Sequence, residues 1–349
     1  MDKIINVGIA GFGMSGQIFQ APFLDADDRF CIRKVYERTT NISSQQYPYV
    51  EVVRSFEDLL TEDIDLVIIS TPNALHFSMA KEAMEAGKAV IVEKPAAATA
   101  QEVERLMQTA ETNGVLFSVY QNRRLDGDFL TVKKIVESGE LGRITDYECR
   151  YDRFECGRCG KEWKAAGGSG IGVLYDLGVH IIDQAVTLFG MPKEVYADLR
   201  REREESGSDD NFQVILYYPD KKVVLSSSEL VLEKGPHYAV HGTEGSFVKY
   251  GMDSQEDALI AGIRPGTAGF GEDGEEMYGI LHTSRNGVES RKKIPTEKGF
   301  YGAYYDNIYE VMTQGGDLFV KPSQARDVLG ILEAAIRSNN EKRRVKPEF

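Results

Sequence analysis

The first third of the chain alternates short apolar runs with amphipathic stretches, a pattern that predicts strands and helices in turn. Runs without polar interruption are typical of strands that are covered on both faces. Helix signals separate these runs, among them the capping box Thr99-Ala100-Gln101-Glu102, whose helix ends at Gly114. Alternating strands and helices with short links predict an α/β domain with a parallel, doubly wound sheet. The expected strands are 4–10, 30–36, 66–69, 89–92 and 115–119, and a further helix covers 74–86.

After residue 120 the pattern changes to strands that follow one another with few helices between them. Consecutive strands with short turns indicate a largely antiparallel sheet. The chain therefore divides into a domain with a doubly wound parallel sheet, 1–121, and a second domain with a largely antiparallel sheet, 122–349. We expect strands at 144–151, 195–200, 212–218, 223–228, 237–242, 246–249 and 277–282, helices at 128–137, 174–188, 304–314 and 323–339, and a surface loop at 262–274.

The turn after the first strand reads Gly11-Phe12-Gly13-Met14-Ser15-Gly16. In a dinucleotide-binding G-x-G-x-x-G, the first glycine permits a tight turn, the second lets the backbone approach a pyrophosphate, and the third lets the helix pack close to the strand. The free N–H groups of the helix N-terminus then face the phosphates. Glu37 follows about 20 residues later, where the fingerprint places an acidic residue. The alternative is a glycine-rich turn that holds no ligand.

The choice between NAD and NADP depends on two neighbouring residues. Glu37 favours NAD, because a carboxylate accepts hydrogen bonds from a ribose 2′-hydroxyl and repels a 2′-phosphate. Arg38 could clamp that phosphate instead. We expect NAD(P) with a slight preference for NAD, and NADP stays open.

Polar residues follow two further strands at the edge where ligands of such sheets bind. Thr71-Pro72-Asn73 follows one of them and either contacts the dinucleotide or forms a turn in which Asn73 caps the next helix, or does both. His76 is either a cofactor contact or an exposed helical residue. Glu93-Lys94-Pro95 ends the next strand. A lysine there is costly unless it has a partner or a task, so Lys94 is a candidate catalytic residue, with a structural ion pair as the alternative. A cis bond at Pro95 would fix the direction of Lys94.

Asp176 and His180 stand four residues apart, a spacing that places them on one face of a helix. Histidine is a suitable acid or base near neutral pH, and a carboxylate one turn away can hold its tautomer or orient a substrate. The alternative is a buried histidine with a purely structural role.

Composition narrows the class of protein. The 349 residues, 42% hydrophobic and 28% charged, are typical of a globular protein with two domains. A net charge of −14 disfavours nucleic acid as a partner. No apolar run spans a bilayer and no signal peptide is evident, so we expect a cytoplasmic protein without a membrane partner. Four cysteines make no disulfide scaffold. Cys156 and Cys159 form a C-x-x-C without a second pair, so we expect no metal, with a zinc or redox role as the minor alternative.

Taken together, these motifs resemble those of the Gfo/Idh/MocA oxidoreductase family. The resemblance rests on Gly11 to Gly16, Thr71-Pro72-Asn73 with His76, Glu93-Lys94-Pro95, Asn122-Arg123-Arg124 and Asp176-Leu177-Gly178-Val179-His180, and it extends over nearly the whole chain. Residues 121–131 and 241–247 are similar to a narrower branch that includes NADP-dependent scyllo-inositol dehydrogenases.

The resemblance implies an enzyme that transfers a hydride between a nicotinamide and a secondary alcohol or ketone of a sugar or cyclitol. His180 would take the hydroxyl proton, Lys94 would hydrogen-bond the same oxygen, and Asp176 would orient both partners. Glu93 and Asn122 would contact the cofactor, and Arg123 and Arg124 the substrate. The resemblance also implies an N-terminal Rossmann domain, 1–121, and a C-terminal α/β domain, 122–349, with a large open, mostly antiparallel sheet. It further implies a homodimer or homotetramer that assembles through this sheet. Trp163 and Tyr305 are further substrate-binding candidates, each with a packing role as the alternative.

One departure leaves the substrate open. In the inositol-dehydrogenase branch the stretch before Trp163 usually resembles R-P-E, whereas this chain has Cys156-Gly157-Arg158-Cys159. Two other functions also stay open: a dinucleotide-binding redox sensor or regulator without turnover, and an enzyme that uses a permanently bound cofactor for non-redox chemistry.

Overall fold

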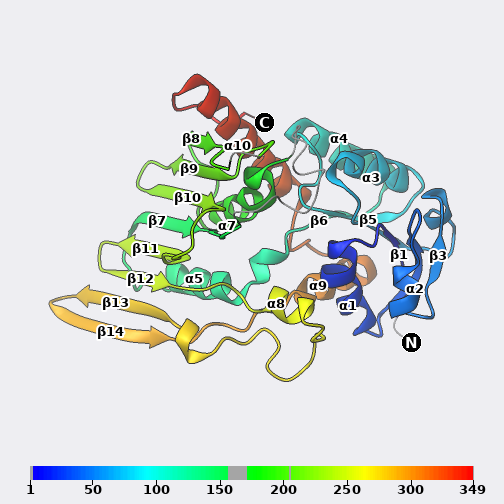
Figure 1. Ribbon diagram of the computed structural model, residues 1–349, viewed down its shortest axis with the longest axis horizontal. Coiled ribbons are helices and arrows are strands. Elements are labelled where there is room, and N and C mark those ends of the chain that lie inside the picture. Colours follow the sequence, from blue (N-terminus) through cyan, green and yellow to red (C-terminus); the bar gives the residue numbers. More distant parts are fainter. Residues whose placement is uncertain (1–2, 156–170, 204–205, 349) are drawn as a thin grey trace. The chain divides into compact units, whose positions relative to one another are not determined.

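The computed structural model describes residues 3–155, 171–203 and 206–348 (Figure 1). They form two compact units. Unit 1 comprises Met1–Asn122, Ser254–Phe270 and Phe300–Arg326, and unit 2 comprises Arg123–Asp253, Gly271–Gly299 and Asp327–Phe349. The prediction divides the chain at 121/122 into two continuous domains, whereas each of these units consists of three separate stretches of the chain.

Unit 1 is built on a six-stranded sheet in the order β3-β2-β1-β4-β5-β6, in which every pairing is parallel. This strand order is that of the doubly wound dinucleotide-binding fold, and it confirms the predicted fold class. The short edge strand β3 was not predicted. The strands are β1 (Ile5–Ala10), β2 (Phe30–Tyr36), β3 (Glu51–Val53), β4 (Leu66–Ile69), β5 (Ala89–Glu93) and β6 (Phe117–Tyr120).

Helices connect these strands and pack beside them. The Thr99 side chain accepts a hydrogen bond from the backbone N–H of Glu102 at 3.2 Å, and Gly114 ends the same helix with φ +63°, as the capping signals predict. The helix predicted over 74–86 begins as a tight 3₁₀ turn and continues as α3. The helices and turns of unit 1 are η1 (Gly16–Gln20), α1 (Ala21–Asp25), α2 (Ile42–Gln46), η2 (Glu57–Leu59), η3 (Asn73–Leu75), α3 (His76–Glu85), α4 (Ala100–Asn113), η4 (Asn122–Leu125, which runs across the unit boundary), α8 (Gln255–Ile260) and α9 (Gly302–Gln314).

Aromatic packing explains why a helix from near the end of the chain belongs to unit 1. Tyr304 and Tyr305 of α9 are buried against Tyr120 of β6, with ring centroids 4.9 and 6.0 Å from that of Tyr120. The Tyr304 hydroxyl also donates a hydrogen bond to the Ser118 hydroxyl at 2.8 Å. Helix α9 therefore completes the core of the N-terminal sheet rather than that of unit 2.

Unit 2 contains an eight-stranded sheet in the order β14-β13-β12-β11-β7-β10-β9-β8. Only β7 and β10 pair in parallel, so the sheet is mostly antiparallel, as predicted. The polar strand β14, which was not predicted, continues the hairpin from β13. The strands are β7 (Ile144–Arg150), β8 (Glu194–Arg200), β9 (Asn211–Tyr217), β10 (Lys222–Ser228), β11 (Tyr238–Gly242), β12 (Gly245–Lys249), β13 (Gly279–Arg285) and β14 (Val288–Ile294).

In β8, β9 and β12 alternate residues are buried. Helices α5 (Gly127–Ser138) and α7 (Val179–Phe189) pack on the sheet. A π-helical turn, η5 (Leu174–Gly178), leads into α7. Helix α10 (Pro322–Glu341) lies beside the edge strand β8, where the Ser338 hydroxyl and the Asn339 side chain accept hydrogen bonds from backbone N–H groups. The 3₁₀ turn η6 (Glu275–Met277) follows the predicted loop at 262–274, in which Phe270 is buried.

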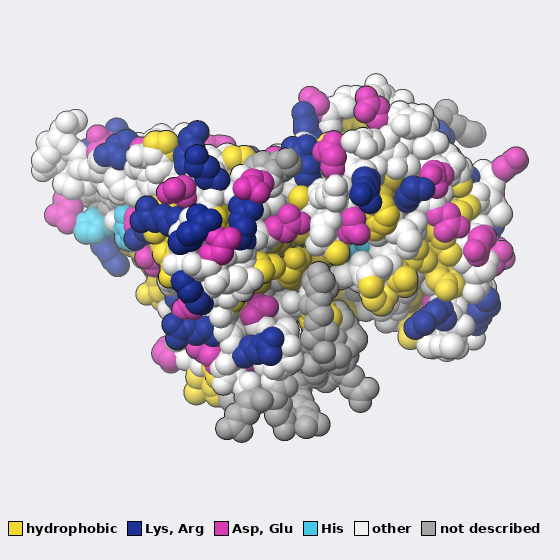
Figure 2. All heavy atoms as spheres, turned by 90° about the horizontal axis from the view of Figure 1, so that it is seen from above, with side chains coloured by type: hydrophobic (Ala, Val, Ile, Leu, Met, Phe, Trp, Pro, Cys, Tyr) yellow, Lys and Arg dark blue, Asp and Glu magenta, His cyan; other side chains and the backbone are white. Residues whose placement is uncertain are grey.

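Among the residues that the structure describes, no helix is both long and apolar enough to cross a membrane. On the face drawn in Figure 2, Lys and Arg side chains are interspersed with Asp and Glu side chains.

Candidate dinucleotide site and active-site residues

The glycine-rich turn follows β1 directly, and its first and last glycines are required by the chain itself. Gly11 has φ +90°, and a Cβ atom there would lie 2.9 Å from the carbonyl oxygen of Ser70. A Cβ atom at Gly16 would lie 2.8 Å from the carbonyl oxygen of Gly11. Any larger residue at either position would displace backbone.

Gly13 differs from both, because a Cβ atom at this position would meet no protein atom within 4 Å. The fold therefore gives no steric reason for glycine here, whereas the close approach of a pyrophosphate does. Of the two side chains that flank it, Phe12 is buried and Met14 is largely exposed. The residues present therefore fit a dinucleotide, whose pyrophosphate the turn from Gly11 to Gly16 would hold.

The carboxylate of Glu93, at the end of β5, ties this turn to the neighbouring strand. It accepts hydrogen bonds from the Ser15 hydroxyl and from Nε2 of Gln20, the latter at 2.6 Å, and from the Lys94 backbone N–H at 3.2 Å. The Tyr305 hydroxyl donates to the other end of the Gln20 amide. Burial raises the pKa of Glu93, against the effect of its hydrogen bonds and of Lys94. Glu93 and Tyr305 thus support the turn from the protein side.

His76 joins the ends of β4 and β5. Its ring nitrogens lie 2.8 Å from the carbonyl oxygens of Pro95 and Thr71, and burial lowers its pKa. The ring is 1% exposed, so the alternative of an exposed helical residue is wrong. Thr71 and Asn73 lie on the adjoining turn, and the Lys94–Pro95 peptide bond is cis.

Glu37 follows β2 at the fingerprint position, but its carboxylate faces the protein. It accepts hydrogen bonds from the Thr40 hydroxyl, from the backbone N–H groups of Ile42 (3.0 Å) and Ser43 (2.8 Å), and from the Ser43 hydroxyl (2.5 Å). Burial raises the pKa of Glu37, but these hydrogen bonds outweigh it, so the pKa lies below its usual value. Glu37 therefore closes the loop that leads into α2, while Arg38 is exposed.

In unit 2, Asp176 and His180 lie at the entry to α7, and the local helix is not the regular one that their spacing predicts. Asp176 belongs to the π-helical turn η5 and is half-buried, whereas His180 is buried in the first turn of α7. Asp209 holds the start of this turn, since its carboxylate accepts a hydrogen bond from the Leu174 N–H at 2.8 Å. A Cβ atom at Gly178 would lie 2.9 Å from Leu174. Single π turns inside helices are frequent at functional sites, and η1 beside the glycine turn is another.

The two arginines that the sequence offers as substrate contacts have partners within unit 2. Arg124 forms a two-pronged ion pair with Asp183, with both hydrogen bonds at 2.6 Å and both side chains at most 3% exposed. The Nη1 atom of Arg123 lies 3.3 Å from Oδ2 of Asp126, and the guanidinium packs over the ring of Tyr151. Arg124 is thus paired within unit 2, and its role as a substrate contact stays a prediction. Asn122, the last residue of unit 1, is buried.

Three of the predicted features are not placed. Trp163, Cys156 and Cys159 lie outside the described residues. Within the described part of the chain, no group of three His, Cys, Asp or Glu side chains could hold a metal ion.

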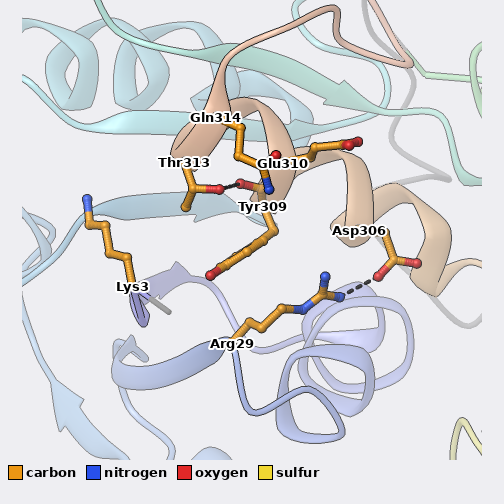
Figure 3. Close-up of a pocket in the computed structure, with 7 residues that line it drawn as sticks. All are labelled: Lys3, Arg29, Asp306, Tyr309, Glu310, Thr313 and Gln314. Carbon is orange, nitrogen blue, oxygen red and sulfur yellow. Dashed lines mark hydrogen bonds and ion pairs between the residues drawn. The ribbon is translucent and has the colours of Figure 1, made fainter. Parts of the chain in front are cut away.

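A cavity of about 640 Å³ opens elsewhere in unit 1 (Figure 3). Its lining residues Lys3 and Arg29 precede β1 and β2, so it lies at the amino ends of these strands, and α9 supplies the other wall. Dinucleotides bind at the carboxyl ends, where the glycine turn and Glu93 lie. This cavity is therefore distinct from the candidate site, and Arg29 in it is already paired with Asp306.

Sequence reasoning did not identify three supporting residues: Gln20, Arg54 and Asp183. Each has a partner at least 17 positions away in sequence, namely Glu93, Glu37 and Arg124. A buried polar residue in an apolar helix, such as Asp183 in α7, is the one signal that could have been followed.

The fold and these residues define a dinucleotide-binding protein of the Rossmann class with a second α/β unit. Residues 5–121 match the family described as "Oxidoreductase family, NAD-binding Rossmann fold", and residues 133–346 match "Oxidoreductase family, C-terminal alpha/beta domain". The chain belongs to the Gfo/Idh/MocA family of NAD(P)-binding oxidoreductases, which confirms the resemblance drawn from its motifs.

Similar proteins cover nearly the whole chain. An NADP(+)-dependent scyllo-inositol 2-dehydrogenase of Bacillus subtilis is 41% identical over 345 residues, which are 99% of this chain and 96% of that protein. The solved structure of a putative oxidoreductase of Bacillus subtilis superposes with a TM-score of 0.96 at 41% identity, covering 100% of this chain and 99% of the other. A putative oxidoreductase of Bacteroides fragilis gives a TM-score of 0.90 at 42% identity, covering 99% and 100%.

Proposed function

We propose that this protein is an NAD(P)-dependent dehydrogenase that acts on a secondary alcohol, or in reverse on a ketone, of a sugar or cyclitol. The observation that carries the proposal is the set of ionisable residues Lys94, Asp176 and His180. The same chain has a glycine turn in which a Cβ atom added at the middle glycine, Gly13, would meet no protein atom within 4 Å. A protein that only binds or senses a dinucleotide needs no acid or base. The similarity to a scyllo-inositol 2-dehydrogenase supports a polyol as the substrate class.

Each of the three residues has one task. An imidazole nitrogen of His180 takes the proton of the substrate hydroxyl as the alcohol is oxidised and returns it in the reverse direction. The Lys94 ammonium donates a hydrogen bond to the same oxygen and stabilises the negative charge that develops on it. The Asp176 carboxylate orients the imidazole and the substrate. The nicotinamide, when bound, accepts or supplies the hydride.

The test follows reduction of NAD⁺ and of NADP⁺ by near-ultraviolet absorbance against a panel of inositols, aldoses and sugar derivatives. Turnover of any secondary alcohol in the panel supports the proposal. His180→Ala should abolish that turnover while dinucleotide binding, measured by titration calorimetry, stays close to that of the wild type. Turnover that survives this substitution would refute the role of His180. Binding without turnover across the panel would favour a redox sensor or regulator instead.

A further inference from the structure

The π turn η5, which carries Asp176, is capped by a residue from a distant part of the chain. The first N–H groups of a helix have no partner within the helix, and Val173, at the cap position, has no side-chain acceptor. Instead the Val173 N–H donates to the carbonyl oxygen of Asp209 at 2.9 Å, and the Leu174 N–H donates to the Asp209 carboxylate at 2.8 Å. Asp209 therefore holds two successive N–H groups at the start of η5.

Gly172 connects Asp209 to Asp176. Its carbonyl oxygen accepts a hydrogen bond from the Asp176 N–H at 3.0 Å, so the position of Gly172 determines where Asp176 lies. A Cβ atom at Gly172 would collide with the Asp209 carboxylate, and φ at this position is +114°, a conformation that favours glycine. The backbone thus passes directly against the carboxylate, and a displacement of Asp209 reaches Asp176 through a single residue.

The segment that begins with Asp209 also contacts the other end of the turn. Phe212 of β9 is 1% exposed, and a Cβ atom at Gly178 would lie 3.3 Å from its ring. The backbone at Gly178 therefore approaches Phe212 closely. Residues 209–212 thus contact η5 at its start and at its end.

The π form of η5 determines how Asp176 is directed. A π turn closes i→i+5 hydrogen bonds, so it contains one residue more than an α-helical turn. Successive residues of an α-helix are about 100° apart around the helix axis. If η5 became a regular α-helix, the Asp176 side chain would turn by about this angle relative to His180. The direction of the carboxylate therefore depends on the contacts that keep η5 in its π form.

We propose that Asp209 is a positioning residue that keeps η5 in its π form and thereby sets the direction of Asp176 relative to His180. Asp209 acts through the turn and takes no part in the proton transfer itself. The inference rests on the roles of Asp176 and His180 in the proposed function. It does not depend on which polyol or which dinucleotide the protein uses.

Amide hydrogen exchange, followed by mass spectrometry, tests the contact without any substrate. Asp209→Ala removes the acceptor of the Leu174 N–H, so residues 172–178 should exchange faster than in the wild type. Asp209→Asn keeps an acceptor oxygen of the same reach and should exchange like the wild type. Gly172→Ala places a methyl group against the same carboxylate. It should reproduce the effect of Asp209→Ala, and it keeps the test decisive if Asp209→Ala does not fold.

Steady-state kinetics test the consequence for catalysis, with an alcohol that the wild type oxidises. The kcat of Asp209→Ala should fall by about 10- to 100-fold, because small displacements of catalytic groups have effects of this size. The KM for the dinucleotide, whose candidate site lies in unit 1, should stay close to that of the wild type. Asp209→Asn should retain most of the kcat. A purely structural residue would instead lower the melting temperature without a selective loss of kcat in the folded protein.

Asp210 provides the matched control, because this neighbouring carboxylate holds a different loop. It accepts hydrogen bonds from the Glu202 N–H at 2.6 Å and from the Arg203 N–H at 3.0 Å. Asp210→Ala should therefore lower the melting temperature, whereas its kcat and the exchange of residues 172–178 should stay close to those of the wild type.

Three outcomes would overturn the inference. They are unchanged exchange of residues 172–178 in Asp209→Ala, faster exchange there with unchanged kcat, and an equal loss of kcat in Asp210→Ala, which would indicate a general destabilisation of unit 2. Absence of turnover by the wild type would refute the proposed function instead. The exchange of residues 172–178 would still decide whether Asp209 holds the turn.

Discussion

Arg124 and Asp183 form a deeply buried ion pair in unit 2, with two hydrogen bonds at 2.6 Å. Removing one partner of such a pair leaves an uncompensated buried charge and costs about 3–5 kcal/mol. We therefore expect Arg124→Ala to lower the free energy of unfolding by about this amount, as measured by urea denaturation. Arg200→Ala breaks an exposed pair with Asp198 and is the control, with little expected change. Loss of turnover in Arg124→Ala with unchanged stability would instead favour the role of a substrate contact.

Asp128 predicts a pH dependence of stability. Burial, and next the charge of Asp253, raises the pKa of Asp128 to about 7. An unfolded aspartate titrates near about 3.9, so the folded state holds this proton more tightly. The resulting stabilisation is complete below about pH 4 and is lost as the pH rises through about 7.

His237, whose Nε2 atom lies 3.5 Å from Oδ2 of Asp128, gives the stability of the protein the opposite dependence on pH. Burial lowers its pKa to about 4, so its contribution is present above about pH 6.5 and is lost as the pH falls toward 4. Asp128→Asn removes only the first trend. Its free energy of unfolding should therefore rise more steeply than that of the wild type from about pH 4 to 6.5. Urea denaturation at a series of pH values measures this, and parallel curves would contradict it.

At the scale of elements, the π turn η1 depends on one buried carboxylate. Glu93 receives hydrogen bonds from Ser15 and Gln20, and a buried donor without its acceptor costs about 1–3 kcal/mol. We expect Glu93→Ala to weaken NADP⁺ binding severalfold because the glycine turn loses its support. Glu93→Gln keeps one acceptor oxygen and should retain more of the affinity. Calorimetric titration alongside thermal melting distinguishes the two effects, and a lower melting temperature with unchanged affinity would leave Glu93 a purely structural residue.

Most elements could be predicted from the sequence because their signals are local. The strand predicted at 30–36 matches β2, and the caps of α4 lie where the sequence places them. Strand β3 has only three residues, and β14 is largely exposed, so neither has an apolar run to reveal it. The π turns at Gly16–Gln20 and Leu174–Gly178 also have no local signature, because they depend on partners distant in sequence, such as Glu93 and Asp209.

The candidate site was predictable in residue type but not in orientation. Glu37 occupies the position that the fingerprint requires, yet the donors that claim its carboxylate follow it within six residues, on the loop and on α2. Such a local cap competes with the ligand for the same lone pairs. Spacing alone identifies the glycine turn, because the backbone geometry requires glycine at Gly11 and Gly16 whatever the side chains do. It cannot decide which way a carboxylate faces.

At the scale of the whole molecule, the return of α9 to unit 1 is the feature that no local pattern reveals. Helix α9 pairs its tyrosines with β6 almost 200 residues earlier, as the hydrogen bond from Tyr304 to Ser118 shows (|i−j| = 186). Amphipathic periodicity indicates that a helix buries one face, but it does not indicate against which sheet that face packs. The domains predicted from the sequence are two continuous stretches of the chain. A helix such as α9, however, belongs to the unit against which it buries its apolar face.

One face of the unit 2 sheet has a row of apolar side chains that predicts how copies of the chain assemble. Tyr196 of β8, Ile215 of β9 and Val224 of β10 are cross-strand neighbours and are only partly buried, whereas their sequence neighbours Val195 and Val214 are buried. A row of apolar side chains on a sheet face is a surface that a second copy of the sheet can cover. We therefore expect the protein to form a homodimer or homotetramer through this face.

Light scattering after size-exclusion chromatography measures the assembly directly. Ile215→Lys places a charge in the centre of the row and should reduce the mass toward that of a single chain, because burying an unpaired ammonium is costly. Leu232→Lys substitutes an exposed apolar residue outside the strands and should leave the mass unchanged. Circular dichroism checks that both variants fold. A single-chain mass for the wild type would refute the assembly, and an unchanged oligomer in Ile215→Lys would place its interface on another surface.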